Sequence, residues 1–257
     1  MDRATQLGIG MAIGAVLIAN LLEGGNPMSL LLMPPILLVV GGTIGATVAG
    51  GTMSDAKTAV HSLVRAFTWR PQMAADLVPV VVSLADTARR EGLLMLEDKV
   101  SDVGDDFLNR AVRLTVDGTD PEELREILEA ELYAKKAADK RAAKFYHDMG
   151  GYAPTIGIVG TVMGLVHVLE NLSTPDKLGH LIAGAFVATL WGVMTANLIW
   201  LPIGNRLARL GELEARRMEV VVEGVLAVQA GANPRVVQQR VNSLLPAADR
   251  EPDKKAA

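Results

Sequence analysis

Long apolar runs alternate with charged blocks along this chain. Four runs contain almost no Asp, Glu, Lys or Arg, and each reaches or approaches the roughly 20 residues that a membrane-spanning helix needs. Most ionisable residues lie instead between the second and third runs or after the fourth. The pattern predicts an all-α integral membrane protein with four transmembrane helices, at about residues 4–22, 29–50, 152–170 and 178–203.

The polar block between the second and third runs is predicted to be entirely helical. Pro71 can begin a helix, and Pro79 should kink or divide it. Further on, Asp120 and Pro121 have the pattern of a helix start, and no strong breaker follows before the two glycines at 150–151. We therefore expect one helix to run from Pro121 into the third apolar run.

The fourth apolar run is likewise expected to continue as a helix into polar sequence. A last helix should begin at Asn233-Pro234, and the final dozen residues, 246–257, should be disordered. The predicted domains are residues 1–51 (transmembrane helices 1 and 2), 52–151 (a helical cytoplasmic domain), 152–204 (transmembrane helices 3 and 4, extending into the cytoplasm) and 205–257 (cytoplasmic C-terminal helices and a tail).

The distribution of lysine and arginine predicts the orientation in the membrane. Lys177 is the sole basic residue in the two turns that join runs one to two and three to four. The positive-inside rule therefore places both charged blocks and both termini in the cytoplasm. The first run lacks a small-x-small cleavage site, so we expect it to be kept as a helix rather than removed as a signal peptide.

Composition and motifs exclude several classes of function. No basic tract points to nucleic acid, and the absence of cysteine excludes disulfides and thiolate metal sites. The sequence contains no phosphate loop, no GxSxG and no His-Glu zinc motif, so we predict no catalytic residue, no metal site, no cofactor and no enzyme activity. His167 lies in the third run; we favour a neutral interhelical or interfacial histidine over a proton relay.

Small residues form a stripe on each of the last two apolar runs. The stripes are Gly157, Thr161, Gly164 and Val168, and Ala185, Thr189, Gly192 and Ala196, both with spacings of 4, 3 and 4. They could pack within the chain, with each threonine bonding its own i−4 carbonyl, or receive another helix. Since the chain has no ionisable side chain at mid-membrane, conduction of an ion would require an acid from another chain.

Three stretches carry a resemblance to a known family. "APTIGIVGTVMGLVHVLENL", "LIAGAFVATLWGVMTANLIWLPI" and "ARREGLLMLE", together with the four-run layout, resemble the flagellar motor stators of the MotA/TolQ/ExbB family. The resemblance implies a pentamer in the bacterial inner membrane around two helices of MotB, whose transmembrane Asp carries H⁺ or Na⁺. It also implies that ion flow turns the ring and that the cytoplasmic domain pushes on the rotor protein FliG.

The resemblance assigns roles to individual residues. It implies that two prolines couple ion flow to movement; the alternative is that they only mark helix ends. It also implies that a charged segment contacts the rotor; the alternative is that this segment is simply solvated. The residues concerned are Pro154 and Pro202 for coupling, and Arg89 and Glu97, with Arg90 and Asp98 nearby, for rotor contact.

An ion path is expected along the small-residue stripes. Its predicted lining is Thr161, Thr189, Gly157, Gly164, Ala185 and Gly192. Within the resembling family, threonine at position 161 is associated with sodium-driven stators, so we lean towards Na⁺ and keep H⁺ as the alternative. Two other functions remain open: an ExbB- or TolQ-like energiser, which typically has three membrane helices, and a non-conducting membrane scaffold.

Overall fold

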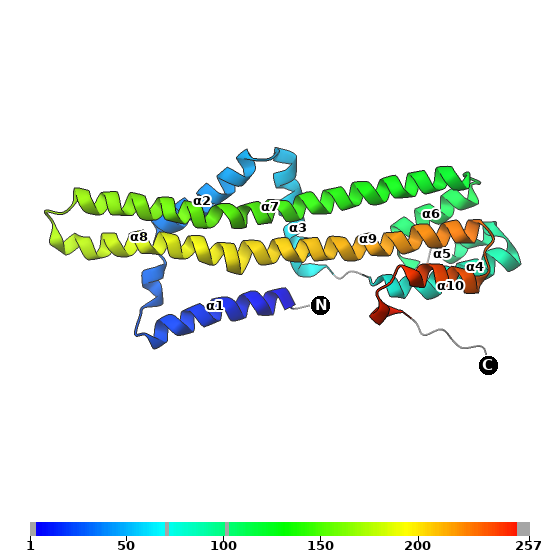
Figure 1. The fold of residues 1–257 in the computed structure, drawn as a ribbon, viewed down its shortest axis with the longest axis horizontal. Helices are drawn as coiled ribbons and strands as arrows, with labels where there is room; N and C mark the ends of the chain where they lie inside the picture. Colours follow the sequence, from blue (N-terminus) through cyan, green and yellow to red (C-terminus); the bar gives the residue numbers. More distant parts are fainter. Residues whose placement is uncertain (1–3, 70–71, 101–102, 251–257) are drawn as a thin grey trace. The chain divides into compact units, whose positions relative to one another are not determined.

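The computed structural model describes residues 4–69, 72–100 and 103–250, and all regular structure within these ranges is helical. The chain divides into two compact units. Unit 1 comprises residues 1–70 and 139–209, and unit 2 comprises residues 71–138 and 210–257. Two helices, α7 and α9, contribute residues to both units (Figure 1).

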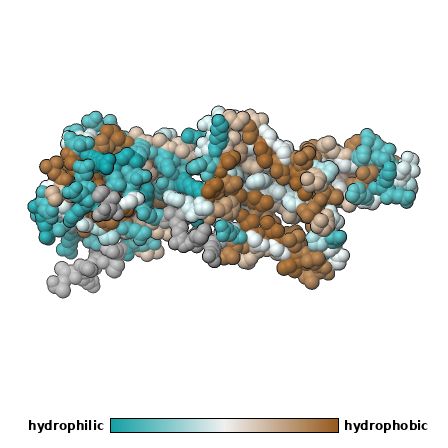
Figure 2. All heavy atoms as spheres, turned by 180° about the vertical axis from the view of Figure 1, so that it is seen from behind, coloured by the Kyte–Doolittle hydropathy of each residue, from teal (hydrophilic) through white to brown (hydrophobic). Residues whose placement is uncertain are grey.

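Unit 1 contains the apolar helices. Three helices are long and apolar enough to cross a membrane, and a fourth, α2, is apolar but shorter. Figure 2 shows apolar residues gathered over the surface that includes α1 and α2. The elements are α1 (Ala4–Leu22), the 3₁₀ turn η1 (Pro27–Leu30), α2 (Met33–Ala49), α3 (Met53–Thr68), the second part of α7 (Pro121–Glu170), α8 (Pro175–Thr195), the π-helical turn η4 (Ala196–Trp200) and the start of α9 (Leu201–Gln229).

The second apolar helix begins later than its hydropathy predicts. A helix from residue 29 is wrong, because residues 27–30 form η1 and α2 starts only at Met33. Pro34 and Pro35 explain the boundary, since a proline has no N–H to donate and fits best in the first helical turn. The first apolar helix, by contrast, has the predicted bounds.

Both predicted helix continuations are confirmed. α7 runs without interruption for 50 residues, and the Asp120 side chain accepts a hydrogen bond from the Glu122 N–H at 2.9 Å at its start. α8, η4 and α9 form one continuous helical segment from Pro175 to Gln229. The π-helical turn within it was not foreseen, and it ends two residues before the segment's Pro202.

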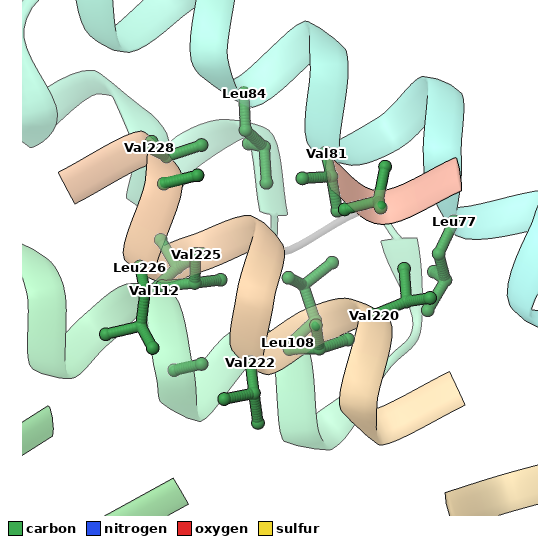
Figure 3. Packing of buried hydrophobic residues seen from close by; sticks show 14 of the residues in the cluster. Leu77, Val81, Leu84, Leu108, Val112, Val220, Val222, Val225, Leu226 and Val228 are labelled. Atoms are coloured by element: carbon green, nitrogen blue, oxygen red, sulfur yellow. The ribbon is translucent and has the colours of Figure 1, made fainter. Parts of the chain in front are cut away.

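Unit 2 is a helical domain with a buried aliphatic core. Leucine and valine side chains from α4, α6 and α9 interlock in its centre (Figure 3). The elements are α4 (Ala74–Glu91), η2 (Leu93–Met95), α5 (Leu96–Val100), α6 (Asp106–Val116), the first part of α7, the second part of α9, α10 (Pro234–Ser243) and η5 (Ala247–Asp249). The buried Asp105 caps α6 by accepting from the N–H groups of Phe107 and Leu108, and it also pairs with the half-buried Arg217.

The polar regions follow the expected helix boundaries in some places and depart from them in others. Pro71 lies outside the described residues; α4 begins at Ala74, and Pro79 does not divide it. The neighbouring Val78 and Val81 are buried in the core, and their packing outweighs one lost hydrogen bond. The start of α10 is confirmed, with Asn233 as its cap. Within the tail predicted to be disordered, residues 247–249 instead form a 3₁₀ turn, since two alanines there carry no helix penalty.

Candidate functional site

The two small-residue stripes pack against each other in the hairpin formed by α7 and α8. A Cβ added to Gly157 would lie 2.9 Å from the Ala188 carbonyl oxygen and 3.1 Å from the Gly192 Cα. One added to Gly164 would lie 2.7 Å from the Ala185 Cβ. Glycine therefore lets the two backbones touch. Of the two uses expected for the stripes, packing within the chain is the one seen in the single chain.

A pair of threonines joins the two helices midway along this contact. The hydroxyl oxygens of Thr161 and Thr189 are 2.5 Å apart. The Thr161 hydroxyl is also 2.9 Å from the Ala185 carbonyl on the opposite helix and 3.2 Å from its own i−4 carbonyl at Gly157. The Thr189 hydroxyl lies 3.4 Å from that same Gly157 carbonyl. Four oxygens thus converge in an apolar surrounding, and both threonines are half-buried.

The α2 helix covers one side of the hairpin. A Cβ on Gly42 of α2 would lie 3.1 Å from Ile156 of α7, and one on Gly160 would lie 2.9 Å from Leu38 of α2. A Cβ added to Gly184 of α8 would lie 3.9 Å from Leu32, the residue that precedes α2. Contacts on both helices of the hairpin thus fix which side α2 occupies.

The opposite side of the hairpin, which we call the open side, is exposed. Helical spacing places on it Ile158, Val162 and Leu165 of α7, and Phe186, Val193 and Asn197 of α8 and η4. The apolar members are 42–63 % exposed. By the same spacing, the half-buried threonine pair lies at the edge of this side. None of these six described residues of the open side has an ionisable side chain.

The two predicted coupling prolines lie inside helices: Pro154 in α7, and Pro202 in α9 two residues after η4 ends. A Cβ on Gly192 would lie 2.7 Å from the Ala153 carbonyl oxygen, and one on Gly150 would lie 2.5 Å from Leu201. On α7 these two contacts lie just before Pro154, and on the other helix they lie on either side of η4. Because Pro154 and Pro202 lack an N–H, each frees a carbonyl one turn back, and the two weakened turns lie at the same level. Their role in coupling stays a prediction.

The helix α3 is anchored beside the polar end of the hairpin. The Tyr146 hydroxyl donates a 2.8 Å hydrogen bond to the Ala59 carbonyl, and Arg65 forms a 2.6 Å ion pair with Asp139. Burial raises the pKa of Tyr146 to about 12. At the start of α3, where Thr52 and Asp55 form a capping box, the hydrogen bond that the Thr52 hydroxyl donates to the Asp55 carboxylate lowers the pKa of Asp55, and the bond from the Thr52 N–H adds to this.

The predicted rotor-contact residues gather around one tight turn of unit 2. Arg89 and Arg90 occupy the exposed last turn of α4, and Glu97 and Asp98 lie exposed on α5. Gly92, between the two charged pairs along the chain, ends α4 with a φ of +90°, a conformation that favours glycine. Arg90 pairs with Asp86 at 3.0 Å, and Glu97 lies 3.9 Å from Arg113. Such exposed pairs contribute little to stability.

Two features near the site were not predicted from the sequence. The first is the π-helical turn η4. The second is the Trp191 indole, which donates a 2.6 Å hydrogen bond to the Leu30 carbonyl and so ties α8 to the turn before α2. His167 is exposed near the end of α7, 3.2 Å from Glu170, which fits an interfacial position better than a relay inside the hairpin.

Comparison with known proteins gives consistent matches over almost the whole chain. Residues 99–220 match the MotA/TolQ/ExbB proton channel family, and residues 6–92 match the motility protein A N-terminal family. Motility protein A of Bacillus subtilis is 37% identical over 252 residues, covering 97% of this chain and 93% of the relative.

Two solved structures share the fold. The structure of C. jejuni MotAB superposes with a TM-score of 0.91 and 29% identity, covering 98% of this chain and 100% of that one. The flagellar MotAB stator complex from Bacillus subtilis gives a TM-score of 0.88 and 35% identity, covering 96% and 98%.

Proposed function

We propose that this chain, which belongs to the MotA/TolQ/ExbB proton channel family, is a stator subunit of a bacterial flagellar motor. The observation that carries the proposal is the match to two MotAB structures over at least 96% of the chain. The family consists of multi-pass membrane channels rather than enzymes. In this role the chain converts an ion gradient into mechanical work.

The open side of the hairpin supports a single-helix partner of the MotB type. The chain supplies a threonine pair at mid-membrane but no acid, so a carboxylate on the partner would carry the ion. Because the glycines are already used in the contact between α7 and α8, the partner packs on the open side, beside Thr161 and Thr189. The driving force is about 2.3 kcal/mol per charge for each 100 mV of membrane potential.

The remaining parts of the machine follow from the same proposal. Five copies form a ring in the bacterial inner membrane, each with four transmembrane helices, α2 being the shortest, and with both termini in the cytoplasm. Unit 2 contacts the rotor protein FliG through Arg89, Arg90, Glu97 and Asp98. Movement at Pro154 and Pro202 couples the partner's change of charge to rotation of the ring. The uneven Lys and Arg distribution supports the orientation.

The coupling ion is proposed to be Na⁺, with H⁺ as the competing choice. A cation that sheds water needs oxygen ligands, and the threonine pair with its two carbonyls offers four. We expect swimming speed to rise with external Na⁺ at constant pH and Thr161→Ala to alter that dependence. A speed independent of Na⁺ would identify H⁺ as the ion, and an unchanged Thr161→Ala variant would remove this residue from the path.

Ion flux in liposomes tests the proposal directly. The chain alone should not conduct, and co-reconstitution with a MotB-type partner, freed of any periplasmic plug, should allow flux. A partner with Asn in place of its transmembrane Asp serves as control. Flux from the chain alone would contradict the proposal, and the match of residues 6–92 to a motility protein model already disfavours an ExbB- or TolQ-like energiser.

A further inference from the structure

The π-helical turn η4 and Pro202 together deprive the Asn197 carbonyl of its usual helical donors. The Leu201 N–H bonds to the Ala196 carbonyl, five residues back instead of four. The Asn197 carbonyl would accept from Leu201 in an α-helix, but that N–H is taken. It would accept from residue 202 in a π-helix, but Pro202 has no N–H. Both ordinary partners of this carbonyl are therefore excluded.

The Asn197 side chain adds a second free oxygen at the same place. Its amide nitrogen donates a 2.9 Å hydrogen bond to the Val193 carbonyl. This bond holds the side chain against the helix and leaves Oδ1 as an acceptor. Asn197 is exposed. In a membrane-spanning segment, polar groups left open in this way are costly unless they line a cavity or meet a ligand.

The position of Asn197 relates it to the threonine pair. Thr189, Val193 and Asn197 are spaced by four residues and lie on the open side, so Asn197 is about 12 Å along the helix from Thr189. On the same side, beyond the threonines in the other direction, lie Leu165 and Phe186, whose side chains are apolar and exposed. The open side is therefore polar on one half of the hairpin only, the half that the proposed orientation places towards the cytoplasm.

We infer that Asn197 forms a second cation site, made of its side-chain Oδ1 and its own backbone carbonyl. The ligand is a monovalent cation, Na⁺ or a hydronium ion, that has left the partner's carboxylate and is moving to the cytoplasm. The inference rests on the proposed stator function and assigns a site to the step in which the ion moves from the partner's carboxylate towards the cytoplasm. Neutral oxygens suit this step, because a weakly bound cation can leave again. Interrupted helices with free carbonyls bind cations in this way in transporters, and π turns recur at functional sites.

Cysteine accessibility tests whether water reaches this site. The chain has no cysteine, so a single Asn197→Cys variant is chemically unique. Inside-out vesicles containing the full chain and its partner are treated with a membrane-impermeant cationic methanethiosulfonate. We expect fast modification of Asn197→Cys and none of Leu165→Cys, on the outer half of the open side, or of Val159→Cys, on another face of α7. Modification of Asn197→Cys no faster than that of Val159→Cys would overturn the inference.

Flux measurements test whether the site acts on the ion. With the partner present, Asn197→Leu should lower flux about tenfold, whereas Asn197→Ser, which keeps a side-chain oxygen, should retain most of it. Normal flux from Asn197→Leu in membranes where the wild type conducts would overturn the inference alone. Absence of flux from the wild type with its partner would overturn the stator proposal instead. If Asn197→Leu does not accumulate, the serine variant and the cysteine labelling decide.

Discussion

The hairpin in unit 1 and the core of unit 2 are packed in opposite ways. In the hairpin, glycines such as Gly157 and Gly192 lie at the contact, and the large apolar side chains point outwards. In unit 2, large side chains such as Leu108 and Leu128 are completely buried, and charged side chains such as Arg89 and Glu97 are exposed. The two regions thus place apolar bulk on opposite sides of their helices.

The difference reflects the solvent around each region. In water, burial of apolar area drives folding, so the bulk belongs inside. Lipid is as apolar as leucine, so helices in a membrane gain little by burying it and associate instead through close backbone packing and hydrogen bonds. The threonine pair and the glycine contacts supply both of these. A buried leucine therefore stabilises unit 2, whereas an outward-facing leucine of the hairpin contributes little to its stability.

The largest effect is expected from removing a leucine in unit 2. Leu108→Ala should destabilise the fold by about 2–5 kcal/mol, because it leaves a cavity at a position with no exposure. The same change on the open side of the hairpin, Leu165→Ala, should cost less than about 0.5 kcal/mol. Thermal unfolding of the purified chain in lipid nanodiscs compares the two. Equal losses would show that the hairpin buries its leucines as unit 2 does.

A smaller loss is expected from adding one methyl group to the hairpin. Gly157→Ala should cost about 1–3 kcal/mol, because the new carbon meets backbone atoms of α8 that cannot move aside. The control is Gly151→Ala on the same helix, where a Cβ has nothing within 4 Å. That variant should be neutral or more stable by up to about 1 kcal/mol, through helix propensity. If both variants behave alike, close backbone contact does not hold the hairpin together.

An alkaline pH dependence is expected where α3 is anchored. The folded-state pKa of Tyr146, about 12, lies above its ordinary value of 10.0, so the folded chain holds this proton more tightly than the unfolded chain does. Its contribution to stability is complete below about pH 10 and is lost as the pH rises through about 12. Tyr146→Phe should flatten this slope and cost about 1 kcal/mol at neutral pH through the lost hydrogen bond.

Melting temperatures between pH 8 and pH 12 measure the effect of Tyr146. Tyr133→Phe provides the control, since Tyr133 is 76% exposed. An unchanged slope in Tyr146→Phe would assign the alkaline loss to other groups.

The smallest effect on stability is expected from the charged turn of unit 2. Arg89→Glu should change the free energy of unfolding by less than about 0.5 kcal/mol, because Arg89 is exposed. Swimming should nevertheless be impaired, and a compensating charge reversal on the rotor should restore part of it. Arg125→Glu, exposed on α7, is the matched control and should leave swimming intact. Loss of the Arg89→Glu protein from membranes would point to a structural role instead.

Sequence patterns predicted much of the helical layout because those signals are local. Apolar length predicted α1, and the start signal at Asp120 with the absence of a breaker predicted the length of α7. The capping box of Thr52 and Asp55 was readable but overlooked, so α3 was not separated from its neighbours. Pro79 does not divide α4 because its local cost is small beside the burial of residues around it, which only the tertiary structure reveals, and a kink at Pro79 stays a prediction.

The candidate site was predictable only in part. The glycine and threonine spacing located the right residues, but that spacing is the same whether the neighbour is α8 or another chain. The side of the hairpin that α2 covers depends on contacts between residues more than 100 positions apart, such as Gly160 with Leu38. The π turn depends on how two hydrogen bonds rearrange before Pro202, and no residue pattern encodes that choice.

The π turn also sets the rotational phase of everything that follows it. A π-helical turn accommodates about one more residue than an α-helical turn, and one residue corresponds to about 100° of rotation. If the same residues from Ala196 to Trp200 wound as an α-helix, Ile203 and Leu207 would turn by about 100° away from the cluster in which they are buried. A one-residue deletion inside the π turn is therefore expected to keep these side chains in their cluster, whereas the same deletion in the regular helix on either side would rotate everything beyond it by about 100°.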